Sequence, residues 1–264
     1  RNNPDLFSIC EKTLYNYIDE GIFETRNIDL PKKVRFMPRK SGPHHKVDRN
    51  CTIGRKYSDF LLYIQNNPGT DVVEIDSVEG PKGTPVLLTL YFRSCGLQLA
   101  FIREMNNSAS VIDIFNHLYT LLGHDDFTTL FPVVLADNGS EFSNPEAIEN
   151  HITVDEVSGE LSKTRRTIVF YCDPGAPYQK GACERNHEFI RYFVPKGHSF
   201  SDYSQDDISL MMNHINSYTR SEKKNPKSPA SRFIFNFGEA IAKKLGIIMI
   251  SQNEVSLSRS IFKK

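Results

Sequence analysis

The chain contains 264 residues, of which 39% are hydrophobic and 24% are charged. These values are ordinary for a globular protein of one or two domains, and no run approaches the roughly 18 apolar residues of a membrane-spanning helix. Its 32 basic and 32 acidic residues balance, which counts mildly against a DNA-binding protein because such proteins are usually basic.

The first predicted element is a helix from Ser8 to Gly21. Ser8 can cap its start, with Glu11 three residues later as in a capping box, and Gly21 can end it. An ordinary amphipathic helix is the simplest interpretation of this segment by itself. We also expect an N-terminal truncation, because the chain begins with Arg1 instead of Met. The apolar stripe of the helix consists of Leu14, Tyr17 and Ile18.

A run rich in basic residues follows between positions 32 and 56, and only Asp48 opposes its positive charges. A like-charged segment that contains Pro and Gly can form an extended arm along DNA phosphates. A solvated linker without a partner explains the same composition equally well. The basic residues of this arm are Lys32, Lys33, Arg35, Arg39, Lys40, Lys46, Arg49, Arg55 and Lys56.

Three apolar segments then predict an antiparallel meander of strands. They are Asp71 to Asp76, Pro85 to Phe92 and Leu97 to Arg103, and they are rich in Leu, Val, Tyr and Phe. Short turns connect them, with glycines in the first turn and Ser94 to Gly96 in the second.

A helix and a buried strand are expected after the meander. The helix runs from Ser110 to Leu122, with Ser110 and Asp113 as its expected cap and Gly123 at its end. The strand, Phe131 to Ala136, is entirely apolar, which suits the inside of a sheet.

A short helix and a fifth strand complete the predicted sheet region. The helix covers Pro145 to Asn150 and the strand covers Thr167 to Cys172. Between them, the polar segment from His151 to Arg166 predicts a surface insertion or hairpin. By itself, this order of elements indicates a mixed α/β or α+β layer.

Two helices are expected beyond the fifth strand. The first runs from Ala182 to Phe193, and the second runs from Gln205 to Tyr218 with Ser204 as its cap. In the first helix, a period of 3.6 residues groups Glu184, His187, Glu188 and Arg191 on one face. The opposite face, which should pack on the sheet, consists of Ala182, Phe189, Ile190 and Phe193. The buried face of the second helix consists of Ile208, Met211, Met212 and Ile215.

Three acidic residues occupy positions from which carboxylates can converge. Asp76 ends a strand candidate, Asp137 directly follows another, and Glu184 lies at a helix start. Each has an ordinary explanation by itself, as a turn former, a helix cap or a partner of the helix dipole. Together they can hold a pair of divalent metal ions, which clamps the attacking and leaving oxygens of a phosphoryl displacement.

Other residues compete for a place in this site. Glu74 would share a strand face with Asp76, and Glu188 lies one helical turn after Glu184. Cys183 has no paired base, and metal-assisted transfer requires no covalent intermediate, so we do not expect it to be a nucleophile. The remaining rival carboxylates are Glu79, Glu141 and Asp173.

The cysteines predict neither a zinc site nor a disulfide scaffold. They are odd in number, scattered, and form no Cys-x-x-Cys pair, which fits a reducing cytoplasm. They are Cys10, Cys51, Cys95, Cys172 and Cys183.

Three stretches carry a family resemblance. They are Ile75 to Gly80, Asp137 to Phe142 with the pattern Asp-Asn-Gly-Ser-Glu-Phe, and Glu184 to Gly197 with its Pro-Lys-Gly exit. These stretches resemble bacterial insertion-sequence transposases of the DDE, retroviral-integrase-like superfamily, and above all the insertion-sequence-thirty family. The resemblance extends from about Ser8 to about Phe235.

The resemblance implies a ribonuclease-H-like α/β core, a mixed sheet flanked by helices. It implies that Asp76, Asp137 and Glu184 are catalytic metal ligands, with Mg²⁺ as the cofactor and Mn²⁺ as a substitute. The first helix would be the recognition helix of an incomplete helix-turn-helix. The implied domains are a helix-turn-helix remnant at 1–25, a basic linker arm at 26–66, a catalytic core at 67–197 and a C-terminal helical region at 198–264.

The implied function is a DNA transposase that cleaves insertion-sequence ends and joins them to target DNA. It would work as a homodimer or a larger synaptic oligomer in the bacterial cytoplasm, associated with the nucleoid. A plain nuclease of this fold, or an inactive or domesticated DNA-binding descendant, is the alternative. The DNA-contacting residues would be Lys32, Lys33, Arg35, Arg39, Lys40, Arg185, His187, Arg191 and Lys196.

Overall fold

The computed structural model divides the chain into two units. The first unit covers residues Arg1–Lys46 and the second covers Val47–Lys264. The residues that the structure describes are 10–26, 29–30, 49–154, 161–220 and 227–262.

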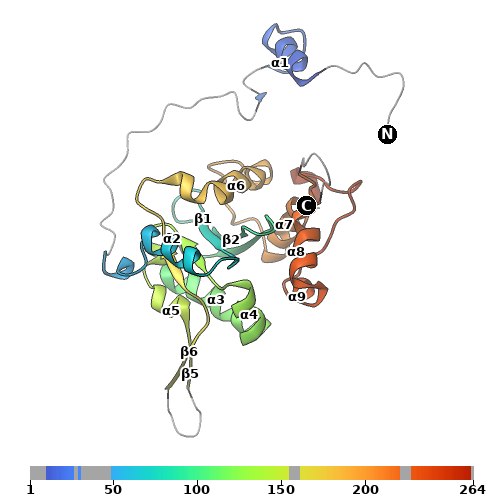
Figure 1. Cartoon of the computed structure of the whole chain (residues 1–264). Coiled ribbons are helices and arrows are strands. Elements are labelled where there is room, and N and C mark those ends of the chain that lie inside the picture. Colours follow the sequence, from blue (N-terminus) through green and yellow to red (C-terminus); the bar gives the residue numbers. More distant parts are fainter. Residues whose placement is uncertain (1–9, 27–28, 31–48, 155–160, 221–226, 263–264) are drawn as a thin grey trace. The chain divides into compact units, whose positions relative to one another are not determined.

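The first unit contains helix α1, Glu11–Asp19 (Figure 1). Its N-cap residue is Cys10, and no side chain caps the helix. The predicted cap Ser8 lies outside the described residues, as do the arm residues from Lys32 to Lys46. Of the predicted stripe, Ile18 is buried and Leu14 is exposed.

Within the described residues of the second unit, five strands form a mixed sheet in the order β3-β2-β1-β4-β7. The pairs β1–β2 and β2–β3 are antiparallel, which confirms the predicted meander, whereas β1–β4 and β4–β7 are parallel. This α/β arrangement of a mixed sheet flanked by helices is the one expected of a ribonuclease-H-like core. The strands are β1 Val73–Val78, β2 Val86–Phe92, β3 Gln98–Arg103, β4 Val134–Ala136 and β7 Val169–Tyr171.

Helices cover both faces of this sheet (Figure 1). The core on one face is built with α3, α4, α8 and α9, and the core on the other face with α2, α6 and α7. In the part of the chain that is described, no helix has both the length and the apolarity that crossing a membrane requires. The helices are α2 Tyr57–Asn66, α3 Ser108–Leu122, α4 His124–Leu130, α5 Pro145–Glu149, α6 Gly181–Phe193, α7 Gln205–Ser217, α8 Pro229–Phe237 and α9 Glu239–Lys244, with short 3-10 turns η2 Arg49–Thr52, η3 Ser140–Phe142, η4 Pro177–Lys180 and η5 Arg259–Ile261.

The alternation of side chains along the strands decides which residues reach each face. Ile75 lies in the core beneath α3, whereas Val78 packs with α6 and α7. Asp76 lies two residues before Val78 and therefore faces the same side of the sheet. In the same way, Asp137 faces the side of Leu135, which packs with α2. Both aspartates therefore belong to the face that α2, α6 and α7 cover.

Helix α3 begins two residues earlier than predicted, and its cap differs. Its N-cap residue is Asn107, whose side chain accepts a hydrogen bond from the backbone N–H of Ser110. The prediction of Ser110 as the cap was therefore wrong. Ser110 lies inside the helix, and its backbone N–H is bonded by the side-chain oxygen of Asn107. Gly123 ends the helix as predicted, with a φ of 84°.

The polar segment after α5 forms a hairpin of its own. Strands β5, Asn150–Val154, and β6, Leu161–Arg165, pair antiparallel in a separate two-stranded sheet. This confirms the predicted hairpin, which extends from the body of the second unit (Figure 1).

Candidate active site

Strand pairing brings Asp76 and Asp137 to the same edge of the sheet. In the parallel pair β1–β4, Val73 lies opposite Val134 and Glu74 lies opposite Leu135. The same offset, continued by two residues, places Asp76 beside Asp137. The carboxyl ends of parallel strands are where open α/β sheets usually bind ligands. The side chain of Asp76 is 17% exposed and that of Asp137 is 44% exposed, so the pair is reachable from solvent.

A buried lysine lies between the two carboxylates. The Nζ atom of Lys180 lies 3.4 Å from Oδ1 of Asp76 and 3.4 Å from Oδ2 of Asp137. It also donates a hydrogen bond to the carbonyl oxygen of Ile75 at 2.8 Å. Lys180 was not among the site residues predicted from the sequence. No signal in the sequence distinguishes it, because a lysine before a helix start is normally exposed.

The electrostatics of this group keep the lysine charged. Burial raises the pKa of Asp76 from 3.8 to about 6, Lys180 opposes this rise, and Asp137 adds to it. Burial also disfavours the charged form of Lys180, but Asp76 and Asp137 outweigh burial, and its pKa is raised. An ammonium ion therefore lies between two carboxyl groups at neutral pH.

His187 points toward the sheet and contacts Asp76, which corrects the predicted exposed face of α6. Its Nδ1 lies 3.8 Å from Oδ2 of Asp76, and its Nε2 lies 2.9 Å from Oγ1 of Thr89. Burial lowers the pKa of His187 to about 4, with smaller contributions from Lys180 and Arg191. The imidazole is therefore neutral at pH 7 and supports Asp76, while its contact with DNA stays a prediction.

Cys183 is buried beside His187, with 3.4 Å between Sγ and Nε2. The prediction that this cysteine has no paired base was wrong, because the imidazole of His187 is such a neighbour. Burial raises the pKa of the thiol, which stays protonated at neutral pH. Among the described residues, ligand atoms of Asp76, Cys183 and His187 lie within 4.8 Å of one another and could share a metal ion. Such binding would require the thiol to lose its proton.

Glu74 is a rival carboxylate that already has its own partners. Its Oε1 accepts a hydrogen bond from Nε of Arg93 at 2.5 Å, and its Oε2 accepts one from the backbone N–H of Cys183 at 3.0 Å. Helix α6 has no side-chain cap of its own. Glu74 therefore holds the first turn of α6 against β1, and this contact fixes the start of the helix near the aspartates.

Glu141, another carboxylate considered for the site, lies in the loop after β4 and is held in place by residues of the sheet. Its Oε1 accepts a hydrogen bond from Oγ of Ser77 at 2.7 Å, and Arg103 donates to that same Oγ at 2.8 Å. Asp137 Oδ1 accepts from the backbone N–H of Gly139 at 2.9 Å. A Cβ at Gly139 would lie 2.5 Å from Oε2 of Glu141 and 3.0 Å from Oδ1 of Asp137, so a larger residue here would have to displace the carboxylate of Glu141.

The remaining predicted residues of α6 lie on or near its exposed side. Glu184 and Arg185 are exposed, and Arg191 donates a hydrogen bond to the carbonyl oxygen of Glu79 at 2.9 Å. Among the described residues, the group of close metal-ligating side chains that contains Asp76 also contains Cys183 and His187, and it does not contain Glu184. The structure places Asp76 and Asp137 around one lysine, and the place of Glu184 in the site stays a prediction. The helix is rotated relative to the prediction, which placed Ala182 and Phe189 on the buried side. The buried residues of α6 are Cys183, Asn186, Ile190 and Phe193.

The oxygen atoms of Asp76 and Asp137 fit a hard divalent cation. Mg²⁺ and Mn²⁺ favour carboxylate and carbonyl oxygens. The two carboxylates already surround one positive charge, the ammonium of Lys180, at equal distances of 3.4 Å. The donor chemistry of this pair therefore suits a divalent cation.

The raised pKa of Asp76 predicts how stability changes with pH. A raised pKa means that the folded protein binds the proton more tightly than the unfolded chain, so this stabilisation is complete below pH 3.8 and is lost as the pH rises through about 6. In chelator, urea melts at a series of pH values should show that Asp76→Asn gains stability relative to the native protein between those values. Parallel pH profiles of the two proteins would contradict the assigned pKa.

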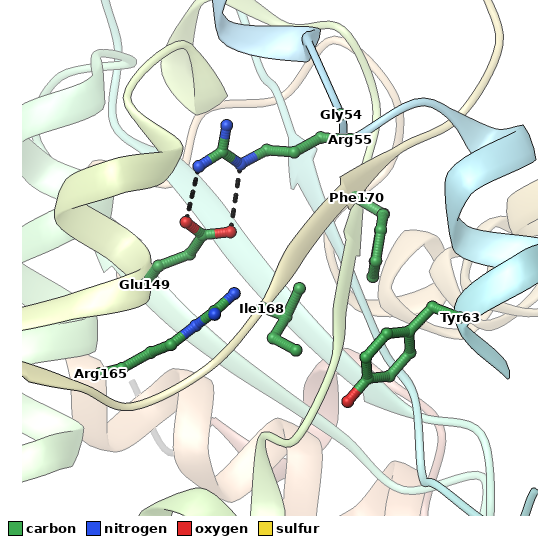
Figure 2. Close-up of a pocket in the computed structure, with 7 residues that line it drawn as sticks. All are labelled: Gly54, Arg55, Tyr63, Glu149, Arg165, Ile168 and Phe170. Carbon is green, nitrogen blue, oxygen red and sulfur yellow. Dashed lines mark hydrogen bonds and ion pairs between the residues drawn. The ribbon is translucent and has the colours of Figure 1, made fainter. Parts of the chain in front are cut away.

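A hollow with a volume of about 440 Å³ lies elsewhere in the unit (Figure 2). Figure 2 shows Arg55 and Glu149 facing each other at its wall, where they form a bidentate pair at 3.1 and 2.7 Å. Glu149 Oε1 also accepts from the backbone N–H of Val169. The lining of this hollow therefore offers one carboxylate, which is paired with an arginine, whereas Asp76 and Asp137 offer two, so the pair is the better candidate for phosphoryl chemistry. The hollow is lined by Gly54, Arg55, Tyr63, Glu149, Arg165, Ile168 and Phe170.

Comparison with known proteins finds transposases that are similar to this chain. The chain is 29% identical over 224 residues to the probable transposase for insertion-like sequence element IS1161 of Streptococcus salivarius, a match that covers 82% of this chain and 54% of that protein. It is 32% identical over 97 residues to the transposase InsI for insertion sequence element IS30A of Escherichia coli strain K12, which covers 34% of this chain and 25% of that protein. No model of a protein family matches the chain.

Among solved structures, the catalytic core domain of BIV integrase is similar, with a TM-score of 0.42 and 15% identity, over 64% of this chain and 96% of that chain. The sequence matches confirm the resemblance that the motifs indicated. The chain spans about half the length of the first of these curated relatives.

Proposed function

We propose that this chain, which is related to the insertion-sequence transposases of the integrase-like superfamily, is part of a DNA transposase that cleaves insertion-sequence ends and joins them to target DNA. The observation that carries the proposal is the convergence of two carboxylates around one positive charge, Asp76 from within β1 and Asp137 from directly after the parallel strand β4. The names of the relatives supply the reaction class, a polynucleotidyl transfer.

The roles of the three acidic residues follow from their positions. Asp76 and Asp137 would hold divalent ions, Mg²⁺ or its substitute Mn²⁺, and Glu184 would complete the set of ligands. When bound, the ions would supply Lewis-acid stabilisation of the attacking and leaving oxygens. His187 and Lys180 would orient Asp76, and Glu74 would keep the start of α6 in register with the strands.

DNA would approach the side of the second unit that carries Asp137 and the exposed residues of α6. Arg185 and Lys196 are exposed there and would contact phosphates, together with Arg191 and His187. The basic arm would add contacts that do not depend on sequence. Action as a homodimer or a synaptic oligomer, within a bacterial cytoplasm, belongs to this proposal. So does the division into a helix-turn-helix remnant, an arm, a core and a C-terminal region, although part of the expected arm, Tyr57–Asn66, forms α2.

The arm makes a prediction about DNA binding. Changing Lys32, Lys33 and Arg35 to Gln should lower the slope of log affinity against log salt by roughly 0.9 for each phosphate of duplex DNA that the arm no longer neutralises. Affinity should fall to a similar degree for every sequence, since phosphates carry no sequence information. Titrations at a series of salt concentrations would measure the slope, and an unchanged slope would reduce the arm to a linker.

The experiment that tests the proposed function uses the full-length protein. It should be incubated with the ends of its own element, a target plasmid and Mg²⁺, and the products scored for nicked ends and joined strands. Joining of ends to target is expected. Cleavage without joining would favour a plain nuclease, and binding without cleavage would favour an inactive DNA-binding descendant, so either result would overturn the proposal.

A further inference from the structure

We propose that Lys180 is a built-in counter-ion of the Asp76–Asp137 pair, and that a divalent metal ion must displace its ammonium group to bind there. This inference rests on the proposed function, because it concerns the same pair of carboxylates. It assigns a role to a residue that is neither a ligand nor a DNA contact, namely to set the metal affinity of the site.

The contacts of Lys180 suit a charge that can be exchanged. Its Nζ lies 3.4 Å from each carboxylate, which is longer than the roughly 2.7–2.9 Å of a firm charge-assisted hydrogen bond. Its firm bond, at 2.8 Å, is to the neutral carbonyl oxygen of Ile75. The lysine therefore balances the carboxylates by charge more than by a fixed bonding geometry, and a second cation can compete for them.

Charge and burial make this competition strong. The side chain of Lys180 is 5% exposed, and interactions between charges are screened least where water is excluded. Two carboxylates beside one ammonium leave one negative charge in excess, whereas a divalent ion would balance both. The groups packed around the ammonium from other elements, Cys172, Cys183 and His187, are neutral at pH 7 and cannot replace it.

The backbone around Lys180 connects its position to α6. Lys180 ends η4, and α6 begins at the next residue, Gly181. The preceding residue is held firmly, because Arg93 donates to the carbonyl oxygen of Gln179 at 2.8 Å and the side chain of Gln179 bonds Asp173. Movement on metal binding would therefore take place in the lysine side chain, four residues before Glu184, while its backbone stays anchored.

The test compares metal binding by the native chain, Lys180→Gln, and the control Lys243→Gln, which removes an exposed lysine of α9. In chelator, Lys180→Gln should melt at a lower temperature than both others, since the two carboxylates repel without their counter-ion. Saturating Mg²⁺ should recover that loss, so the metal-induced rise in melting temperature is larger than in the native chain. Free Mn²⁺ measured by electron paramagnetic resonance should show affinity tighter by about tenfold or more, because a like charge has been removed.

Two outcomes would overturn the role of Lys180. Equal Mn²⁺ affinity in the native chain and Lys180→Gln would do so while leaving the metal site and the proposed function intact. If Lys180→Gln has a lower melting temperature that saturating metal does not restore, Lys180 stabilises the fold without acting as a counter-ion. Absence of any metal response in all three proteins would instead refute the metal site itself.

A double variant covers the case in which Lys180→Gln does not fold in chelator. Lys180→Gln with Asp137→Asn removes the ammonium and one of the two repelling charges. It should fold in chelator and show almost no response to Mg²⁺ or Mn²⁺. If this double variant also fails to fold, Lys180 is needed for a reason other than charge balance, and the inference is wrong.

Discussion

The Asp137→Asn variant should lose cleavage and joining by at least roughly 10²–10³-fold, the range seen when one preorganised electrostatic contact is removed from an active site. Asn keeps the shape of the side chain, and its Oδ1 can still accept the hydrogen bond from Gly139. What it lacks is the negative charge beside Lys180 that would attract a divalent ion. DNA binding should stay close to native, because the proposed phosphate contacts lie on α6, at Lys196 and on the arm.

The matched control is Asp113→Asn, which removes an exposed aspartate of α3 and should leave strand transfer unchanged. Thermal melts with chelator and with Mg²⁺ at constant ionic strength provide a second measurement. The metal-induced rise in melting temperature should shrink in Asp137→Asn and persist in Asp113→Asn. Near-native joining by Asp137→Asn, or an undiminished response to metal, would remove Asp137 from the site.

The sheet was predictable because its strands are short, apolar and separated by turn residues. The five predicted strands are present, and the register of β1 with β4 then follows from the parallel pairing of two buried strands. Asp76 and Asp137 lie far apart in the sequence and were selected because they match motifs of the transposase family. The pairing of β1 with β4 shows how the fold brings them side by side.

The rotation of α6 was predicted less well, for a reason that lies outside the helix. A 3.6-residue period identifies a stripe only where the buried face is apolar, but α6 buries the polar residue Asn186. Its amide is satisfied by Gln98 of β3 and by Arg220. Those partners come from distant parts of the chain, so the burial of Asn186, and with it the inward direction of His187, depends on tertiary contacts.

Lys180 could not be predicted for the same kind of reason. A lysine before a helix start is normally exposed, and charged residues are seldom buried unless they are paired. Its burial depends on η4 placing it beside the ends of β1 and β4, where Asp76, Asp137 and the carbonyl oxygen of Ile75 surround its ammonium group. Sequence alone locates the two acids, and only the fold locates their counter-ion.

The largest effect on stability is expected from Arg166→Met, which should lower the free energy of unfolding by about 3–5 kcal/mol, since each buried acceptor left without a donor costs about 1–3 kcal/mol. Arg166 is 1% exposed, and its guanidinium donates to the carbonyl oxygens of Ile148, Phe115 and Ala147 at 2.9, 3.2 and 3.0 Å. Arg166 thus connects α3 and α5 directly before strand β7.

The neighbouring residue supplies the control for this prediction. Arg165→Met removes the same side chain from an exposed position on β6, where a change should cost no more than about 0.5 kcal/mol. Urea midpoints of the two variants should therefore separate clearly, with similar slopes because the same surface unfolds. The guanidinium of Arg166 also lies 5.5 Å from the ring centre of Tyr119 and 5.6 Å from that of Phe127, so Arg166→Lys, which supplies fewer donors and a different shape, should fall between Met and the native residue. Equal midpoints for Arg165→Met and Arg166→Met would show that the three carbonyl oxygens find other donors and that this buried cation does not hold the helices together.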